Sequence, residues 1–143
     1  MTPRIALLQS MRIAMPNLLL IDTDPSFTYL VERYCQMCDC SVLSVRTPDE
    51  AVQATRNHKQ RDTPALIVIH LTPPPQGAFS LVQFLKQEFA TAHLPVLLCG
   101  TSNDAAGAWE AGADHWLSKP VMLDDFRAVL RAAGLPRQSA LDS

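Results

Sequence analysis

Five short apolar runs alternate with amphipathic stretches along this chain, and that alternation limits the folds open to it more than any other feature. The runs lie at 17–22, 41–45, 65–70, 95–99 and 115–119. Their apolar residues are mostly continuous, which is typical of strands covered on both faces. Strands that alternate with helices form parallel sheets with right-handed crossovers. The pattern therefore predicts an α/β fold, a doubly wound parallel five-stranded sheet with helices on both faces.

The amphipathic stretches carry signals for where helices begin. Asp24 precedes Pro25, and Thr47 precedes Pro48, so each pair places an N-cap residue before a proline that is tolerated in the first turn. The sequence therefore predicts helices that begin at Pro25 and Pro48. Further helices are predicted over 78–90, 104–113 and 123–134.

Length and composition fit a single domain, because 143 residues can enclose one core. The net charge is −2 and the basic residues are scattered, so no basic face indicates a nucleic-acid partner. No apolar run is long enough to span a bilayer. We expect a soluble cytoplasmic protein with its domain at 16–134 and a tail at 135–143. Residues 1–15 are expected to be a disordered extension or, because Met11 and Met15 are also possible starts, partly untranslated.

Polar residues follow most of the predicted strands. In a doubly wound sheet, ligands bind at the carboxyl ends of the strands, so these residues are the candidate functional residues. They are Asp22, Thr23, Asp24, His70, Gly100, Thr101 and Lys119.

Two stretches of the sequence resemble a known family. The opening run LLLIDTDP, the stretch GADHWLSKP with its Lys–Pro pair, and the five-fold order resemble the receiver domain of bacterial two-component response regulators. The likeness covers about residues 17–133. It implies a flavodoxin-like (βα)5 fold with strand order 2-1-3-4-5.

The resemblance also implies a phosphorylation pocket. In the family, an acidic pair after the first strand binds Mg²⁺, and an aspartate at the end of the third strand accepts a phosphoryl group. A Thr or Ser after the fourth strand and a Lys after the fifth contact that group, and an aromatic residue on the fifth strand reports it. Asp22, Lys119 and Trp116 match the first acid, the lysine and the aromatic residue.

The remaining pocket positions depart from the family. Thr23 stands where the second acid belongs, and Asp24, one residue on, is expected to cap the helix instead. His70 stands at the phosphoacceptor position. Gly100 stands at the hydroxyl position, although a shift of one residue would offer Thr101. The resemblance therefore implies a pseudo-receiver with a degenerate pocket.

The charges at these positions argue against metal-dependent chemistry. Asp22 and Lys119 nearly cancel, so Mg²⁺, which prefers several oxygen ligands, would meet one carboxylate. We expect Mg²⁺ binding to be lost or weak, no other cofactor, and no enzymatic activity. His70 is expected to fill the acceptor position and to bond to Asp22 or to the backbone. A purely structural histidine and an unusual phosphoryl acceptor, at His70, Asp22 or Asp24, remain the alternatives.

Three cysteines lie close together in the stretch CQMCDC. Cys35, Cys38 and Cys40 could form a soft-metal or redox module. Cys35 and Cys38 also lie on the helix face that carries Val31 and Tyr34, where small apolar side chains pack against a sheet. We favour core packing over a metal site.

Two tryptophans indicate how the domain would act. Trp109 belongs to the fourth predicted helix and Trp116 to the fifth strand, so both can reach one face. Large aromatic residues often anchor interfaces. We expect a stand-alone atypical receiver that acts independently of phosphorylation, by binding another signalling or output protein in trans. A homodimer through the fourth helix, fifth strand and fifth helix could use the same face.

Overall fold

The computed structural model describes residues 17–56 and 64–136. Within these ranges, five parallel strands form one sheet in the order β2-β1-β3-β4-β5. The strands are β1 (Leu18–Ile21), β2 (Val42–Val45), β3 (Leu66–His70), β4 (Val96–Gly100) and β5 (His115–Ser118). This arrangement confirms the predicted fold class and strand order.

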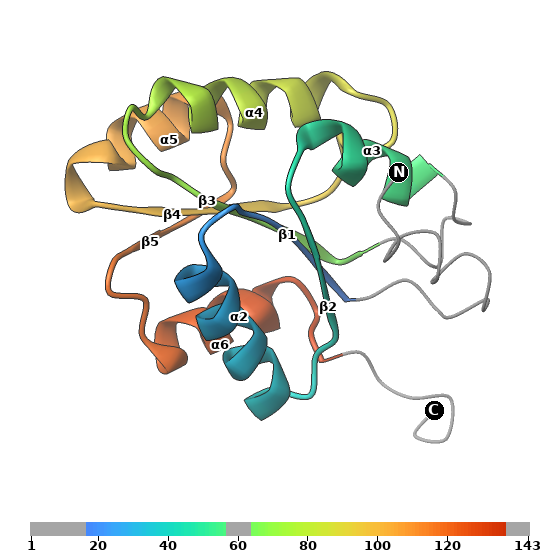
Figure 1. The fold of residues 1–143 in the computed structure, drawn as a ribbon, viewed down its shortest axis with the longest axis vertical. Coiled ribbons are helices and arrows are strands. Elements are labelled where there is room, and N and C mark those ends of the chain that lie inside the picture. Colours follow the sequence, from blue (N-terminus) through green and yellow to red (C-terminus); the bar gives the residue numbers. More distant parts are fainter. Residues whose placement is uncertain (1–16, 57–63, 137–143) are drawn as a thin grey trace.

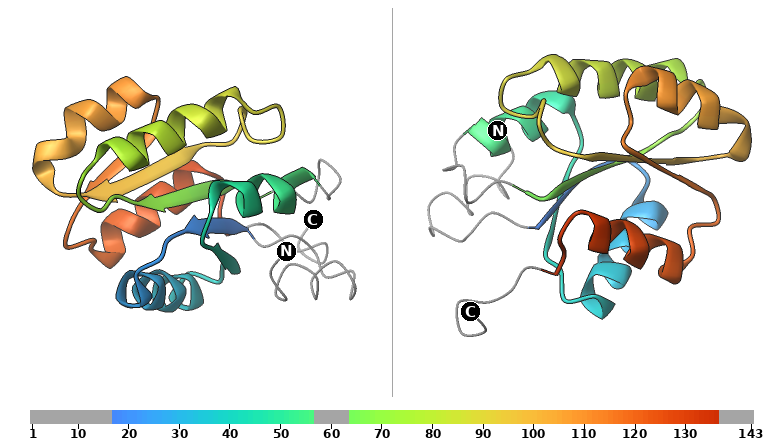
Figure 2. Two further views of the ribbon diagram at one scale, coloured as in Figure 1. Left: turned by 45° about the horizontal axis from the view of Figure 1, so that its top comes forward. Right: turned by 180° about the vertical axis from the view of Figure 1, so that it is seen from behind.

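Helices cover both faces of the sheet (Figure 1). They are α2 (Pro25–Met37), α3 (Pro48–Arg56), α4 (Gln76–Gln87), α5 (Ala105–Ala111) and α6 (Leu123–Ala132), with a 3-10 turn η2 (Ser102–Asp104) before α5. Helices α3, α4 and α5 lie on one face, and α2 and α6 lie together on the other (Figure 2). None of the helices in the described ranges could cross a membrane, since each is too short or too polar.

The central strands divide their side chains between two cores. Successive side chains of a strand point to opposite faces, so Leu19 and Ile21 pack under α3, α4 and α5. Leu18 and Leu20 pack toward α2 and α6 instead. All of these side chains are buried, which explains why the strand sequences are continuously apolar.

The predicted helix starts are confirmed at α2 and α3. The backbone N–H of Ser26 donates to Asp24 Oδ1 at 3.0 Å, and Pro25 occupies the first turn. The backbone N–H of Glu50 donates to Thr47 Oγ1 at 3.1 Å. Each cap satisfies a donor that the first helical turn leaves without an intrahelical partner.

The bounds of three helices differ from the prediction. Helix α4 begins directly after Pro75, before the predicted start at 78, and it ends before Phe89. Helix α5 ends before Gly112, whose φ of 107° is a left-handed conformation that glycine adopts easily. Helix α6 ends before Gly134, which has a φ of 83°. Apolar periodicity alone overestimated the length of these helices at the carboxyl end.

The core also extends past the predicted end of the domain at residue 134. Leu135 is buried, and its backbone N–H donates to the carbonyl of Leu130 at 2.8 Å. This residue therefore belongs to the packed domain and not to the tail. The predicted extension at 1–15 and the tail from 137 onward lie outside the described residues.

Candidate functional site

At the carboxyl edge of the sheet, three polar side chains that follow or end different strands are joined by hydrogen bonds; they are called the chain of three below. Asp22 follows β1, His70 ends β3 and Lys119 follows β5. His70 Nδ1 lies 3.0 Å from Asp22 Oδ1, and Lys119 Nζ lies 2.7 Å from His70 Nε2. The predicted bond between His70 and Asp22 is thus present, and the imidazole also contacts Lys119.

The hydrogen-bond partners assign the proton on the His70 ring. A lysine ammonium can only donate, so Nε2 of His70 accepts from Lys119. The proton of the neutral ring is then on Nδ1, which donates to the Asp22 carboxylate. The ring bridges an anion and a cation, and the three side chains together carry no net charge.

The ring is also held by packing. Phe27, in the first turn of α2, stacks on the imidazole with ring centroids 4.0 Å apart and an interplanar angle of 8°. The side chains of His70 and Asp22 are each only 2% exposed. His70 therefore has little freedom to turn away from its two partners.

Asp22 has further partners besides His70. Thr28 Oγ1 donates to Asp22 Oδ2 at 2.9 Å, and the backbone N–H of Asp24 donates to Oδ1 at 3.0 Å. Burial raises the pKa of Asp22, but the hydrogen bonds from His70, Asp24 and Thr28 outweigh burial and hold that pKa below its ordinary value. The carboxylate is ionised, and both of its oxygens are occupied.

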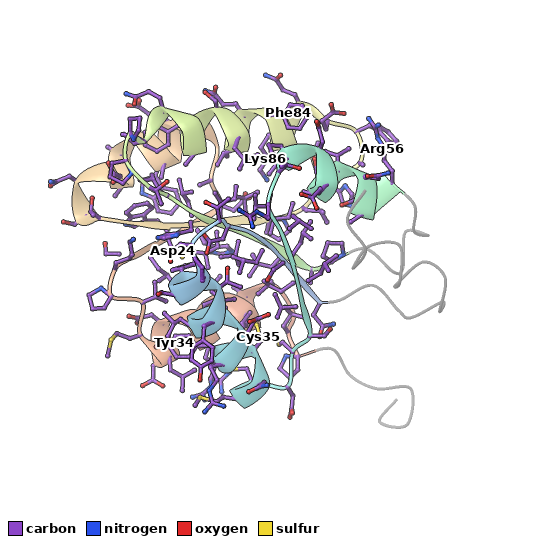
Figure 3. The ribbon with its side chains drawn as sticks, in the orientation of Figure 1. Asp24, Tyr34, Cys35, Arg56, Phe84 and Lys86 are labelled. Atoms are coloured by element: carbon purple, nitrogen blue, oxygen red, sulfur yellow. The ribbon has the colours of Figure 1, made fainter. Side chains whose placement is uncertain are left out.

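The side chains of the other predicted pocket residues do not bond to the side chains of Asp22, His70 and Lys119 in the described ranges, although Asp24 contributes its backbone N–H to Asp22. Asp24 caps α2, where Figure 3 shows it at the amino end of the helix. Thr23 is exposed. Thr101 is exposed too, and its hydroxyl donates to Asp104 Oδ2 at 2.8 Å. Neither threonine replaces the missing acid or hydroxyl of a receiver pocket in this arrangement.

Gly100 is covered by the ring of Trp116. A Cβ atom at Gly100 would lie 3.0 Å from Trp116 Cη2 and 3.1 Å from Leu71 Cβ, so there is little room for any side chain. The indole Nε1 of Trp116 donates to Ser118 Oγ at 3.2 Å, which gives the ring a second point of attachment. The aromatic ring thus occupies the space that a hydroxyl-bearing residue would need.

The two tryptophans have different surroundings. Trp116 is partly buried and packs against the core under α4 and α5. Trp109, on α5, is 52% exposed. Trp109 therefore presents a large apolar surface to solvent, whereas Trp116 is mainly a packing residue.

Cys35 lies in the last turn of α2, at the opposite end of the helix from Asp24 (Figure 3). Cys35 and Cys38 are buried in the core between the sheet, α2 and α6, as the packing interpretation predicts. Burial, with a smaller effect of neighbouring thiols, raises the pKa of Cys35 to about 12 and that of Cys40 to about 11. In the described ranges, no group of three or more His, Cys, Asp or Glu side chains is placed to hold a metal ion.

Two contacts of the site were not predicted from the sequence. Phe27 and Thr28 follow Asp22 in the first turn of α2, and both contact the chain of three. Their only signal in the sequence is their place next to a strand end, which many helix residues share.

The sequence of the chain was compared with those of known proteins. No family model matches the chain. The chain is 30% identical over 123 residues to the DNA-binding dual master transcriptional regulator RpaA of Synechocystis sp., an alignment that covers 82% of this chain and 48% of RpaA. The chain spans about half the length of the curated relatives that it matches.

Solved structures share the fold. The receiver domain of a signal transduction histidine kinase from Syntrophus aciditrophicus has a TM-score of 0.68 and 20% identity, covering 86% of this chain and 94% of that one. The receiver domain of a sensor histidine kinase from Pseudomonas aeruginosa, solved with a magnesium ion in its active site cleft, has a TM-score of 0.67 and 18% identity, covering 85% and 99%. The chain is thus similar in sequence to response regulators and shares the fold of these receiver domains.

Proposed function

We propose that this chain is an atypical receiver that acts without phosphorylation, through contact with another signalling protein. The observation that carries the proposal is the bonded chain of Asp22, His70 and Lys119. In the family, Asp22 would help to hold Mg²⁺ and Lys119 would contact the phosphoryl group. Here both Asp22 and Lys119 are already hydrogen-bonded to the His70 ring.

The donor set at this site does not fit Mg²⁺. That ion requires octahedral oxygen coordination and usually takes one or two carboxylates together with waters. Asp22 offers one buried carboxylate whose oxygens are bonded to His70, Asp24 and Thr28. Thr23 supplies a hydroxyl where a second carboxylate would be needed. Mg²⁺ would have to displace the imidazole, so the proposal includes neither a cofactor nor an enzymatic activity.

An unusual phosphoryl acceptor is less well supported. Asp22 and His70 are only 2% exposed at their side chains, and each ring nitrogen of His70 has a partner. Asp24 is occupied in capping α2. A cysteine-based redox module is less well supported as well, because burial keeps Cys35 and Cys40 protonated at neutral pH.

The interaction face is proposed to lie on α5, β5 and α6. β5 is the last strand of the sheet, so these elements form one edge of the molecule (Figure 1). Trp109 supplies an exposed aromatic anchor on that edge. Trp116, fixed over Gly100 and bonded to Ser118, would hold the face in one conformation.

An NMR titration tests the loss of phosphorylation chemistry. We expect the amide resonances of Asp22, His70 and Lys119 to stay unchanged when Mg²⁺ and then beryllofluoride are added. The double variant Thr23→Asp, His70→Asp restores both missing carboxylates and serves as the positive control, since it should show saturable shifts. Saturable, Mg²⁺-dependent shifts in the unmodified chain would show that the pocket still works.

A further inference from the structure

A cleft of about 340 Å³ opens beside His70, at the carboxyl ends of β1, β2 and β3. In the strand order 2-1-3-4-5 the direction of the winding changes between β1 and β3. Ligands of doubly wound sheets bind at such switch points. The volume also falls within the range of pockets that hold small molecules. The cleft shares Asp22, Thr23 and His70 with the phosphorylation-pocket positions of the family, but it extends away from Lys119 and Gly100, which do not line it, toward Arg46 and the loop prolines.

Much of the lining is apolar. Ile21 and Ile69 are buried strand residues, and Leu81 of α4 is half-buried beside them. Pro73 and Pro74, in the loop between β3 and α4, are exposed and line the cleft as well. Apolar side chains and proline rings favour a ligand with an apolar body.

The polar part of the lining includes one cationic side chain, that of Arg46. Arg46, which follows β2, is exposed, and no hydrogen bond or ion pair joins it to any other residue in the described ranges. Thr23 and Thr72 add hydroxyl groups. The single carboxylate in this part of the lining belongs to Asp22, and its oxygens already accept hydrogen bonds from His70 and Thr28. A guanidinium in this setting matches a carboxylate or phosphate group of a ligand.

We propose that this cleft binds a small organic anion, with the apolar body against the prolines and α4 and the anionic group on Arg46. The observations that support it are the position of the cleft at the switch point, its mixed lining, and the charge of Arg46, which is paired with no described residue. The inference depends neither on the loss of phosphorylation nor on the interaction face of α5, β5 and α6.

The test uses phenylphosphonate, an organic anion whose C–P bond cannot donate a phosphoryl group. We expect saturable amide shifts at Thr23, Arg46 and Gly77 in a titration without Mg²⁺. Methylphosphonate lacks the apolar body and benzyl alcohol lacks the charge, so each should bind about tenfold more weakly than phenylphosphonate. Equal binding of either compound would overturn the proposed pairing of an apolar body with an anionic group.

Two matched arginine variants locate the binding. Arg46→Gln should weaken phenylphosphonate binding about tenfold, since a charge-assisted hydrogen bond is lost. Arg33→Gln is the control, because Arg33 is also exposed and lines another hollow of about 390 Å³, together with Glu32. Equal effects of the two variants, unchanged binding by Arg46→Gln, or no saturation at millimolar concentrations would overturn the proposal.

Discussion

His70 bonds to the buried Asp22 and to the exposed Lys119 with one ring, and this makes it the residue on which the site depends. Its Nδ1 donates to Asp22 and its Nε2 accepts from Lys119. An aspartate at this position could not donate to Asp22 at neutral pH, because two carboxylates side by side repel each other. The histidine is therefore compatible with the remaining acid in the absence of a metal ion.

Removal of the imidazole should destabilise the fold. In His70→Ala, Asp22 stays buried without its main donor and Phe27 loses its stacking partner. We expect the free energy of unfolding to fall by about 3 kcal/mol, because a buried carboxylate loses a hydrogen bond and the missing ring leaves a cavity. Urea denaturation measures the change, and His93→Ala, at an exposed position, is the control. A loss no larger than that of the control would contradict this role.

The lowered pKa of Asp22 predicts a dependence of stability on pH. The pKa of Asp22 in the folded chain lies below its ordinary value of 3.8, so the folded state binds the proton less readily than the unfolded state. The stabilisation by ionised Asp22 is complete above pH values near 4 and is lost as the pH falls through the folded pKa. Unfolding measured in urea from pH 6 to pH 3 should therefore show a smaller decline for Asp22→Asn than for the unmodified chain. Parallel declines would contradict the assignment.

At the scale of elements, the contact between β4 and β5 near Gly100 can be tested by adding a side chain. In Gly100→Ala the new Cβ would meet Trp116 and Leu71 at 3.0 and 3.1 Å, so the indole ring must shift. We expect a changed tryptophan emission spectrum in a Trp109→Phe background, and a loss of about 1–3 kcal/mol from overpacking.

Gly77→Ala is the matched control for that variant. No atom lies within 4 Å of a Cβ built at Gly77, near the start of α4. This variant should leave the emission spectrum unchanged and the stability equal or slightly higher, because alanine favours the helix. An unchanged spectrum in the Gly100 variant as well would show that the ring is free to move.

Most of the elements were predictable because each is encoded locally. A strand buried on both faces requires a continuous apolar run, and a helix start requires a cap such as Asp24 or Thr47. The end of α4 was not predictable from periodicity, since the apolar pattern continues into Phe89, which is 96% exposed. The local sequence pattern does not reveal whether an apolar side chain packs against another element in the folded structure.

The site was predictable in part for a similar reason. Parallel strands bring their carboxyl ends to one edge, so the meeting of Asp22 and His70 follows from topology. The stacking of Phe27 on His70 and the position of Trp116 over Gly100 depend on side-chain conformations. Those conformations result from packing between elements far apart in the sequence.

For the whole molecule, the proposed face makes a prediction about self-association. If two copies of the chain associate through α5, β5 and α6, Trp109→Ala should weaken the dimer at least about tenfold, because exposed tryptophans at interfaces are frequent hot spots. Sedimentation equilibrium measures the dissociation constant. Phe89→Ala removes an aromatic side chain that is 96% exposed and follows α4, so it is the control. Equal effects of both variants would place the contact elsewhere.

The internal pairing of Asp22 with Lys119 through His70 has a consequence for how information could pass through this domain. The state of an ordinary receiver depends on two components from outside the polypeptide, a dissolved ion and a transferable phosphoryl group. A side chain that is part of the polypeptide cannot be depleted, washed out or hydrolysed. If the domain signals in this way, the signal is set by the concentration of the protein. Regulation would then act on the synthesis and degradation of the chain and not on the chemistry of the pocket.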